Sequence, residues 1–290
     1  MRVTVVMPVY NAAPTIDRSL RSIAAQTKPP DKIIIADDRS TDGWPARAAQ
    51  DGLPGLEVVT LPENGGCGAA RNFGVASATT EWLAFLDADD EWAPTFLEEV
   101  CAAIEELGAD FGSSGGVRKL EYRNPPATSM RLLDAPAEPI DLTDDFWRRA
   151  LRFMPIHPSS VVIRRSLYEE VGGFCGEVRN GEDTPLWAEL WRRGRFVFVN
   201  KPLFTSVAPA SGVSAAPVAY HDIRVSLGRI GRSVVRARVA RKRGSAWFAL
   251  WFATAVVRRH ALWLVRTVKR ATRGRRGAQP GSRPALSEKP

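Results

Sequence analysis

Three carboxylates lie within four positions in the segment FLDADDEW, residues 85–92. Asp87 and Asp89 follow an apolar run that is typical of a buried strand, where like charges this close together repel one another. A divalent cation would relieve the repulsion, since Mg²⁺ and Mn²⁺ prefer oxygen ligands and often complete their shells with substrate phosphates. Asp89 and its acidic neighbours could equally cap the helix that follows. This segment alone leaves both interpretations open.

Two other polar segments have the residue types of a nucleotide site. Asp37 and Asp38 end a second apolar run, where acids can receive ribose hydroxyls or a base edge, or can form an Asx-type turn. The glycine-rich segment 64–68 (NGGCG) precedes a predicted helix, whose first backbone amides attract phosphate. Arg71 would lie on the first turns of that helix, within reach of a diphosphate or in a surface ion pair.

Two segments further along could handle a proton or a substrate. Glu182 and Asp183 precede the amphipathic stretch TPLWAELW, so either acid could act as a general base or cap that helix. His157, in MPIHPSS, could contact a substrate, although a lone histidine between prolines is more often structural.

These side chains need a scaffold, and strand and helix patterns alternate along the first 107 residues. Four short apolar runs predict strands at 3–9, 32–36, 56–61 and 82–86, and helical spacing predicts helices at 13–26, 69–76 and 95–107. The alternation indicates an α/β fold with a mostly parallel, Rossmann-like sheet flanked by helices. Ligands on such sheets bind beyond the carboxyl ends of the strands, where three of the polar clusters fall.

Taken together, these segments resemble the inverting family 2 glycosyltransferases, which have a GT-A-type nucleotide-sugar fold. The resemblance rests on VVMPVYNAAPTIDRSLRSIAAQT, KIIIADDRSTDG, NGGCGAARNFGVASATTEWLAFLDADDEW and HPSSVVIRRSLYEEVGGFCGEVRNGEDTPLWAELWRRG. These segments occur in the family's order and cover roughly residues 3–195. The QxxRW motif of processive synthases is absent from the sequence.

The resemblance implies a role for the residues at the donor end of the site. Pro8 and Tyr10 would line the nucleoside pocket, and Asp38 would bind the base or its ribose neighbourhood. Arg71 would help to neutralise the diphosphate. Arg39 departs from the family, which commonly has glycine or a small polar residue there, and this leaves the local turn in doubt.

The resemblance also implies the residues that act on the reaction. Asp87 and Asp89 form the DxD motif, with Asp89 binding Mn²⁺ or Mg²⁺ and Asp87 helping to hold the ribose or the metal. Asp183 is the acid of the ED motif and the expected base. The implied activity is sugar transfer from a nucleotide-diphosphate donor, with a UDP-sugar favoured, to a hydroxyl of a glycan or lipid-linked acceptor. A nucleotidyltransferase is the alternative enzyme, although its glycine- and lysine-rich N-terminal loop is missing.

The C-terminal part of the sequence is strongly basic. Between residues 221 and 290 there are 18 Lys or Arg residues and two acids, in a chain of net charge +8. We expect a catalytic domain at 1–220, a basic amphipathic helical extension at 221–271 and a disordered tail at 272–290. The aromatic run 246–257 has no interleaved basic residues, which favours an anionic membrane surface over nucleic acid as the partner. The alternatives are a non-enzymatic binding protein that uses this tail, and a helical pair packed on the catalytic domain.

The expected compartment follows from the two ends of the chain and from the cysteines. The N-terminus reads as a strand rather than a signal peptide, and three separated cysteines without a CxxC pair fit a reducing compartment. We therefore expect a cytoplasmic protein, peripheral on the inner face of the cytoplasmic membrane.

Overall fold

A computed structural model of the 290-residue chain shows two compact units, Met1–Phe252 and Ala253–Pro290. The structure describes residues 1–44, 53–120, 128–130, 133, 137–151, 154–208, 220–239 and 242–257. The first unit contains the sheet and helices α1 (Ile16–Ala24) to α8 (Tyr220–Val239).

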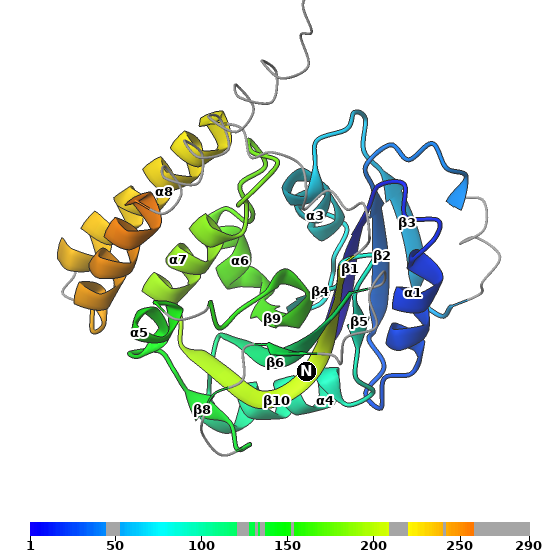
Figure 1. Cartoon of the computed structure of the whole chain (residues 1–290). Helices are drawn as coiled ribbons and strands as arrows, with labels where there is room; N and C mark the ends of the chain where they lie inside the picture. Colours follow the sequence, from blue (N-terminus) through cyan, green and yellow to red (C-terminus); the bar gives the residue numbers. More distant parts are fainter. Residues whose placement is uncertain are drawn as a thin grey trace, which may run out of the picture. The chain divides into compact units, whose positions relative to one another are not determined.

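The N-terminal half of the sheet is parallel, as the sequence predicts (Figure 1). Its strands stand in the order β3-β2-β1-β4, with bounds β1 Val3–Val9, β2 Lys32–Asp37, β3 Leu56–Thr60 and β4 Trp82–Phe85. All seven residues of β1 are buried, because this strand lies inside the sheet and both of its faces are covered. Helices α1 (Ile16–Ala24), α3 (Cys67–Val75) and α4 (Phe96–Leu107) follow β1, β3 and the short strand β5 (Glu91–Trp92).

The second half of the sheet is mixed. Strand β9 (Val161–Arg164) runs antiparallel to both β4 and β6 (Phe111–Leu120), whereas β6 and β10 (Phe196–Ala208) are parallel to each other. Strand β5 closes the order as an antiparallel neighbour of β10. The expected α/β fold is confirmed, and the parallel pattern holds for the strands that carry the polar clusters. The remaining elements are β7 Thr128–Met130, β8 Ile140–Asp141, α5 Phe146–Ala150, the 3₁₀ helix η1 Pro158–Ser160, α6 Arg165–Val171, α7 Thr184–Arg193 and α8 Tyr220–Val239.

Alternate residues of β1 face two different layers. Val5 and Met7 belong to the main core, together with the apolar face of α1. Val6 points to the other face, where α3 approaches so closely that a Cβ on Gly74 would lie 2.7 Å from Val6 Cγ1. Glycine at position 74 therefore lets α3 pack against the sheet, and this fixes the helix that carries Arg71.

One side chain of the aromatic run, Phe248, packs inside the first unit. Residues 245–257 are helical, and Phe248 is fully buried with its ring centroid 4.1 Å from that of Trp147 and 5.2 Å from that of Trp191. Trp247 and Leu250 remain 41% and 47% exposed. Among the described residues, no helix has the length and apolar character needed to cross a membrane. An interfacial role for the extension therefore stays a prediction, and the expected tail at 272–290 lies outside the described residues.

Candidate functional site

The polar loops that follow β1 and β2 are joined at the carboxyl ends of these strands. Val9 pairs with Asp37 across the two strands, so their loops begin side by side. The backbone N–H of Asn11 donates to Ser40 Oγ at 2.9 Å, and the N–H of Thr41 donates to Asn11 Oδ1 at 2.8 Å. The sheet thus brings segments 30 positions apart into one surface, as expected of an α/β sheet.

The turn after β2 explains the family's preference for glycine at position 39. Arg39 has φ +68°, in the left-handed region that favours glycine. The turn is held by a hydrogen bond of 3.1 Å from the Ser40 N–H to Asp37 Oδ1. Arg39 therefore keeps the turn that the resemblance left in doubt, with backbone strain at one residue.

Asp38 holds the glycine-rich turn against the sheet. It is only 3% exposed, and its two carboxylate oxygens accept hydrogen bonds from the N–H groups of Gly65 and Gly66 at 2.7 and 2.8 Å. Asn64 Nδ2 also donates to the Asp38 carbonyl at 2.8 Å. Two of the amides expected to cradle a phosphate therefore contact Asp38 in this structure. The nucleoside contact predicted for Asp38 stays a prediction.

Pro8 and Tyr10 lie at the end of β1, next to these loops. Pro8 is buried within the strand, whereas Tyr10 is 49% exposed. An exposed aromatic ring beside a strand end is suited to stacking on a nucleoside base.

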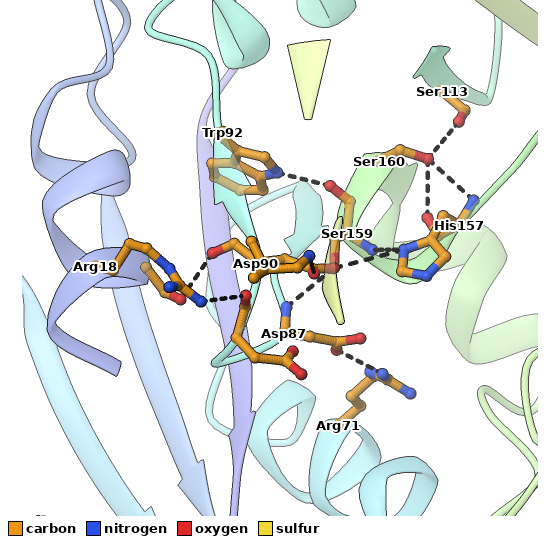
Figure 2. Close-up of polar contacts among 12 residues, drawn as sticks. Arg18, Arg71, Asp87, Asp90, Trp92, Ser113, His157, Ser159 and Ser160 are labelled. Atoms are coloured by element: carbon orange, nitrogen blue, oxygen red, sulfur yellow. Dashed lines mark hydrogen bonds and ion pairs between the residues drawn. The ribbon is translucent and has the colours of Figure 1, made fainter. Parts of the chain in front are cut away.

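Arg71 links three parts of the site. Its guanidinium is 2% exposed and donates through Nη2 to Asp87 Oδ1 at 2.6 Å and through Nη1 to Glu182 Oε1 at 2.9 Å (Figure 2 shows the Asp87 contact). It also lies over the ring of Phe174, with Cζ 4.8 Å from the centroid. Its buried Nε has no hydrogen-bond partner among the described residues. Arg71 thus connects α3, the end of β4 and the loop before α7.

These ion pairs explain how the crowded carboxylates are tolerated. Burial by itself would raise the pKa of Asp87, but Arg71, with a smaller effect from His157, lowers it below the usual range. Burial would likewise lower the pKa of Arg71, and Asp87 and Glu182 outweigh that effect and raise it. Burial raises the pKa of Glu182, which Arg71 offsets only in part. Arg71 therefore offsets carboxylate repulsion that, from the sequence alone, a divalent metal ion was expected to relieve.

Asp90 is the most buried acid of the cluster, although its spacing suggested only a helix cap. It is 2% exposed, and its carboxylate accepts hydrogen bonds from Ser159 Oγ at 2.6 Å and from the Val207 N–H at 3.1 Å (Figure 2 shows the Ser159 contact). Burial, together with the charges of Asp87 and Asp89, raises its pKa well above the usual range. Asp90 therefore ties the DADD segment to η1 and β10.

His157 joins the same cluster. One ligand atom from each of Asp87, Asp90 and His157 lies within 4.8 Å of the others, which makes this group a candidate metal site (Figure 2). His157 Nδ1 accepts a hydrogen bond of 3.1 Å from the Ser159 N–H, and the ring stacks on Phe204 at 5.3 Å. From the sequence, His157 suggested a structural residue or a substrate contact, and not a metal ligand. Its position four residues before a strand that pairs with β4 was the available signal.

The three residues of this group differ in how well they suit a divalent ion. Asp87 and Asp90 offer hard oxygen atoms, and imidazole nitrogen suits Mn²⁺ better than Mg²⁺. The Nδ1 lone pair of His157 is already occupied by an amide N–H, so the two carboxylates fit an ion better than the histidine does. Asp89 is outside this three-residue group, and its backbone carbonyl accepts from Arg18 Nη2 at 2.9 Å. Its role as a metal ligand stays a prediction.

Asp183 is the residue before the first turn of α7. Its carboxylate accepts hydrogen bonds from Thr184 Oγ1 at 3.1 Å and from Trp187 Nε1 at 3.2 Å, both on its own helix. Its neighbour Glu182 is an ion-pair partner of Arg71, and Arg71 in turn contacts Asp87. The structure places the two acids of the ED pair in different surroundings, with Glu182 tied to Arg71 and Asp183 held by α7.

Comparisons with known proteins agree with this fold and identify its family. The family model for "Glycosyl transferase family 2" matches residues 4–172. The "Uncharacterized glycosyltransferase YwdF" of Bacillus subtilis is 32% identical over 183 residues, which cover 62% of this chain and 64% of YwdF. The "Putative teichuronic acid biosynthesis glycosyltransferase TuaG" of the same organism is 36% identical over 200 residues, covering 66% of this chain and 73% of TuaG. The match to YwdF thus spans less than two thirds of that relative.

Solved structures show the same fold. S. aureus TarS 1–349 in complex with UDP superposes with a TM-score of 0.67 and 21% sequence identity, over 90% of this chain and 72% of that chain. The same protein with UDP-GlcNAc gives a TM-score of 0.64 and 23% identity, over 79% and 66% of the two chains. With its mixed α/β sheet, the clustered acids at the strand ends and the match to residues 4–172, this chain belongs to glycosyltransferase family 2.

Proposed function

We propose that this chain is an inverting glycosyltransferase that moves a sugar from a nucleotide-diphosphate donor, with a UDP-sugar favoured, to a hydroxyl of a cell-envelope glycan or lipid-linked acceptor. The observation that carries the proposal is the link from Asp87 through Arg71 to Glu182, which joins the strand-end acids to the loop of Asp183. A donor held at the strand-end acids would present its anomeric carbon towards the loop of Asp183. The solved TarS complexes with UDP and UDP-GlcNAc support the choice of donor.

Each group at the donor end has a proposed part in binding. Tyr10 and Pro8 would line the nucleoside pocket, with Asp38 beneath it. The diphosphate would lie against Asp87 and Arg71, where the buried Nε–H of Arg71 is a donor that a phosphate oxygen would satisfy.

Asp87 and Asp89 would hold a divalent ion, Mn²⁺ or Mg²⁺, with Asp90 and His157 beside them. Bound there, the ion would neutralise the negative charge that develops on the departing diphosphate.

The reaction itself needs one displacement. The acceptor oxygen forms a bond to the anomeric carbon on the face opposite the diphosphate, while the bond from that carbon to the diphosphate oxygen breaks. The bonding electrons leave with the nucleoside diphosphate, and the acceptor proton passes to the Asp183 carboxylate. Because the hydrogen bonds from Thr184 and Trp187 hold that carboxylate on α7, it is pre-positioned for this step.

We also propose that the protein works at the inner face of the cytoplasmic membrane. Trp247 and Leu250 are exposed on the helix at 245–257, in a part of the sequence that is rich in arginine. Aromatic and basic side chains together favour the interface of an anionic bilayer. Relatives named for teichuronic acid and succinoglycan biosynthesis support an envelope or extracellular polysaccharide as the product.

A panel of nucleotide sugars tests the activity. The full chain is incubated with UDP-, GDP- and dTDP-linked sugars and Mn²⁺ or Mg²⁺, and the melting temperature and products are measured. We expect one donor class to raise the melting temperature and to release nucleoside diphosphate. Release of pyrophosphate would instead identify a nucleotidyltransferase and overturn the proposal.

A further inference from the structure

A cavity of about 220 Å³ lies between α6, α7 and α8, away from the strand-end acids. Its lining includes four arginines and two glutamates: Arg193, Arg229, Arg232, Arg236, Glu170 and Glu189. The guanidinium groups therefore outnumber the carboxylates on the cavity wall. Such a wall favours an anion, because planar guanidinium groups bind phosphate oxygens in pairs.

The glutamates of the wall already have partners. Glu170 pairs with Arg193, and Glu189 accepts two hydrogen bonds from Arg192, which lies outside the cavity lining. Glu189 also accepts from Ser233 at 2.5 Å, and Arg236 Nη1 lies 3.7 Å from it. Both glutamates of the wall are thus engaged with arginines, and Arg236 shares Glu189 with Arg192 and Ser233.

Arg232 is the arginine that remains. It has no ion-pair partner among the residues that the structure describes, and its side chain is exposed at the cavity. It stands three positions after Arg229 and four before Arg236, so the three guanidinium groups share one face of α8. Like charges at this spacing repel, and a bound anion would offset that repulsion.

The cavity begins next to the loop of the ED pair. Pro185, in the first turn of α7 and two residues after Asp183, lines it. Ser226 Oγ on α8 donates to the Gly181 carbonyl at 3.1 Å, and Arg229 pairs with Glu177 at 2.5 Å. Arg71 on α3 contacts this loop at Glu182, whereas Ser226 on α8 contacts it at Gly181. The expected diphosphate site therefore adjoins this loop on the side of α3, and the cavity adjoins it on the side of α8.

We propose that this cavity binds a phosphate group carried by the sugar acceptor. The inference rests on the proposed function, because it gives the loop of Asp183 a donor side and an acceptor side. The phosphate anchors the acceptor against Arg229, Arg232 and Arg236, in a cavity whose lining includes Pro185, two residues after the candidate base. The ligand class is a phosphorylated acceptor with exposed, non-bridging phosphate oxygens.

Inorganic phosphate is the probe for this site. The full chain is titrated with phosphate by calorimetry, first alone and then with Mg²⁺ and saturating UDP. Arg232→Glu should raise the phosphate Kd about 10-fold to 100-fold, the usual worth of hydrogen bonds to charged groups. The matched control is Arg21→Glu, an exposed arginine on α1, which makes the same change in net charge and should leave the Kd as in the wild type.

The outcomes separate this inference from the proposed function. Phosphate binding that depends on Arg232 and persists with bound UDP supports the acceptor site. Equal Kd values for Arg232→Glu and the wild type overturn it, and so does displacement of phosphate by UDP, which would place the anion in the donor site. If UDP does not bind while phosphate binds through Arg232, the acceptor role falls with the proposed function.

Vesicles distinguish a lipid headgroup from an acceptor phosphate. Co-sedimentation is measured with vesicles of phosphatidylcholine and phosphatidylglycerol in equal amounts. We expect free phosphate to weaken the binding of the wild type only slightly, because the exposed aromatic residues act elsewhere. If Arg232→Glu abolishes vesicle binding and leaves the phosphate Kd unchanged, the site serves a headgroup and the acceptor assignment is wrong.

Discussion

Arg71 and Glu182 are 111 positions apart in the sequence and form an ion pair of 2.9 Å in the buried centre of the site. The same guanidinium contacts Asp87 at 2.6 Å. One cation therefore joins the acids at the end of β4 to the loop that carries Asp183. The first two predictions follow from this arrangement, and the third concerns the turn at Arg39.

Replacing Arg71 by alanine should destabilise the fold strongly. The substitution leaves Glu182 and Asp87 without their buried partner, and breaking such pairs costs about 3–5 kcal/mol. The measurement is urea unfolding followed by far-UV circular dichroism. Arg71→Lys serves as a second variant in case the alanine protein does not fold, and it should be intermediate, since one ammonium cannot contact both acids as a planar fork does. A loss of less than 1 kcal/mol in the free energy of unfolding of Arg71→Ala would show that the ion pairs of Arg71 contribute little to stability.

Asp183→Asn should suppress turnover and leave donor binding intact. Loss of a general base costs about 10²–10⁴-fold in rate, whereas the hydrogen bond from Trp187 can be kept by the amide oxygen. Steady-state kinetics with the donor found in the panel give kcat and KM separately. Glu182→Gln is the control, and it should lower stability because it weakens the partner of Arg71. If the Asp183 variant keeps the wild-type rate while Glu182→Gln loses it, the base is Glu182.

Arg39→Gly should stabilise the protein by about 1 kcal/mol, because glycine adopts the left-handed backbone without steric cost. The φ of +68° at this residue is the reason. Thermal unfolding of the variant is compared with that of Arg39→Ala, which keeps the strain and should not be stabilised. A gain with alanine as large as with glycine would show that the arginine side chain, and not the backbone, is responsible.

Glu189 should make stability dependent on pH in the acid range. Burial by itself raises its pKa, but hydrogen bonds from Arg192 and Ser233 and the charge of Arg236 lower it below the ordinary value of 4.5. A lowered pKa gives a stabilisation that is fully present above the ordinary value and is lost as the pH falls through the folded-state value. Glu189→Gln should therefore be less stable than the wild type at neutral pH, and the difference should shrink in acid.

Denaturant unfolding at several pH values measures that difference. Glu81→Gln is the control, since Glu81 is 62% exposed in its ion pair with Arg164 and should change little. A constant difference between Glu189→Gln and the wild type across the acid range would contradict the assignment.

Local patterns predicted the strand-end part of the site. Val3–Val9 and the run before Asp87 are apolar segments of strand length, and parallel strands must place their following loops on one edge. Arg39 was the one departure in these loops, and it adopts the left-handed backbone in a turn that the hydrogen bond from the Ser40 N–H to Asp37 holds.

Long-range contacts could not be predicted in the same way. Nothing local in the sequence pairs Arg71 with Glu182, or turns the amides of Gly65 and Gly66 towards Asp38, because these contacts depend on how the elements pack. The sequence pattern around Asp90 suggested a helix cap. Its buried position was not predictable because the residues that contact it, on η1 and β10, lie far away in the chain.

The aromatic run shows a further limit. An apolar helical face has the same pattern whether it meets lipid or protein, since both partners are apolar. Phe248 packs on Trp147 and Trp191, whereas Trp247 and Leu250 on the same helix remain exposed. Only the three-dimensional structure separates these two sets of side chains.

The central claim is that acids at the end of β4 bind an activated sugar's diphosphate with the help of a divalent ion. Calorimetric titration of the folded protein with the donor, with Mn²⁺ and then with EDTA, tests it most directly. The account predicts binding that depends on Mn²⁺ and is lost in Asp89→Ala. If Mn²⁺-dependent donor binding is retained in Asp89→Ala and lost in Asp90→Asn, the ion binds at the Asp87, Asp90 and His157 group instead. Absence of metal-dependent binding for every UDP-, GDP- and dTDP-sugar would contradict the account.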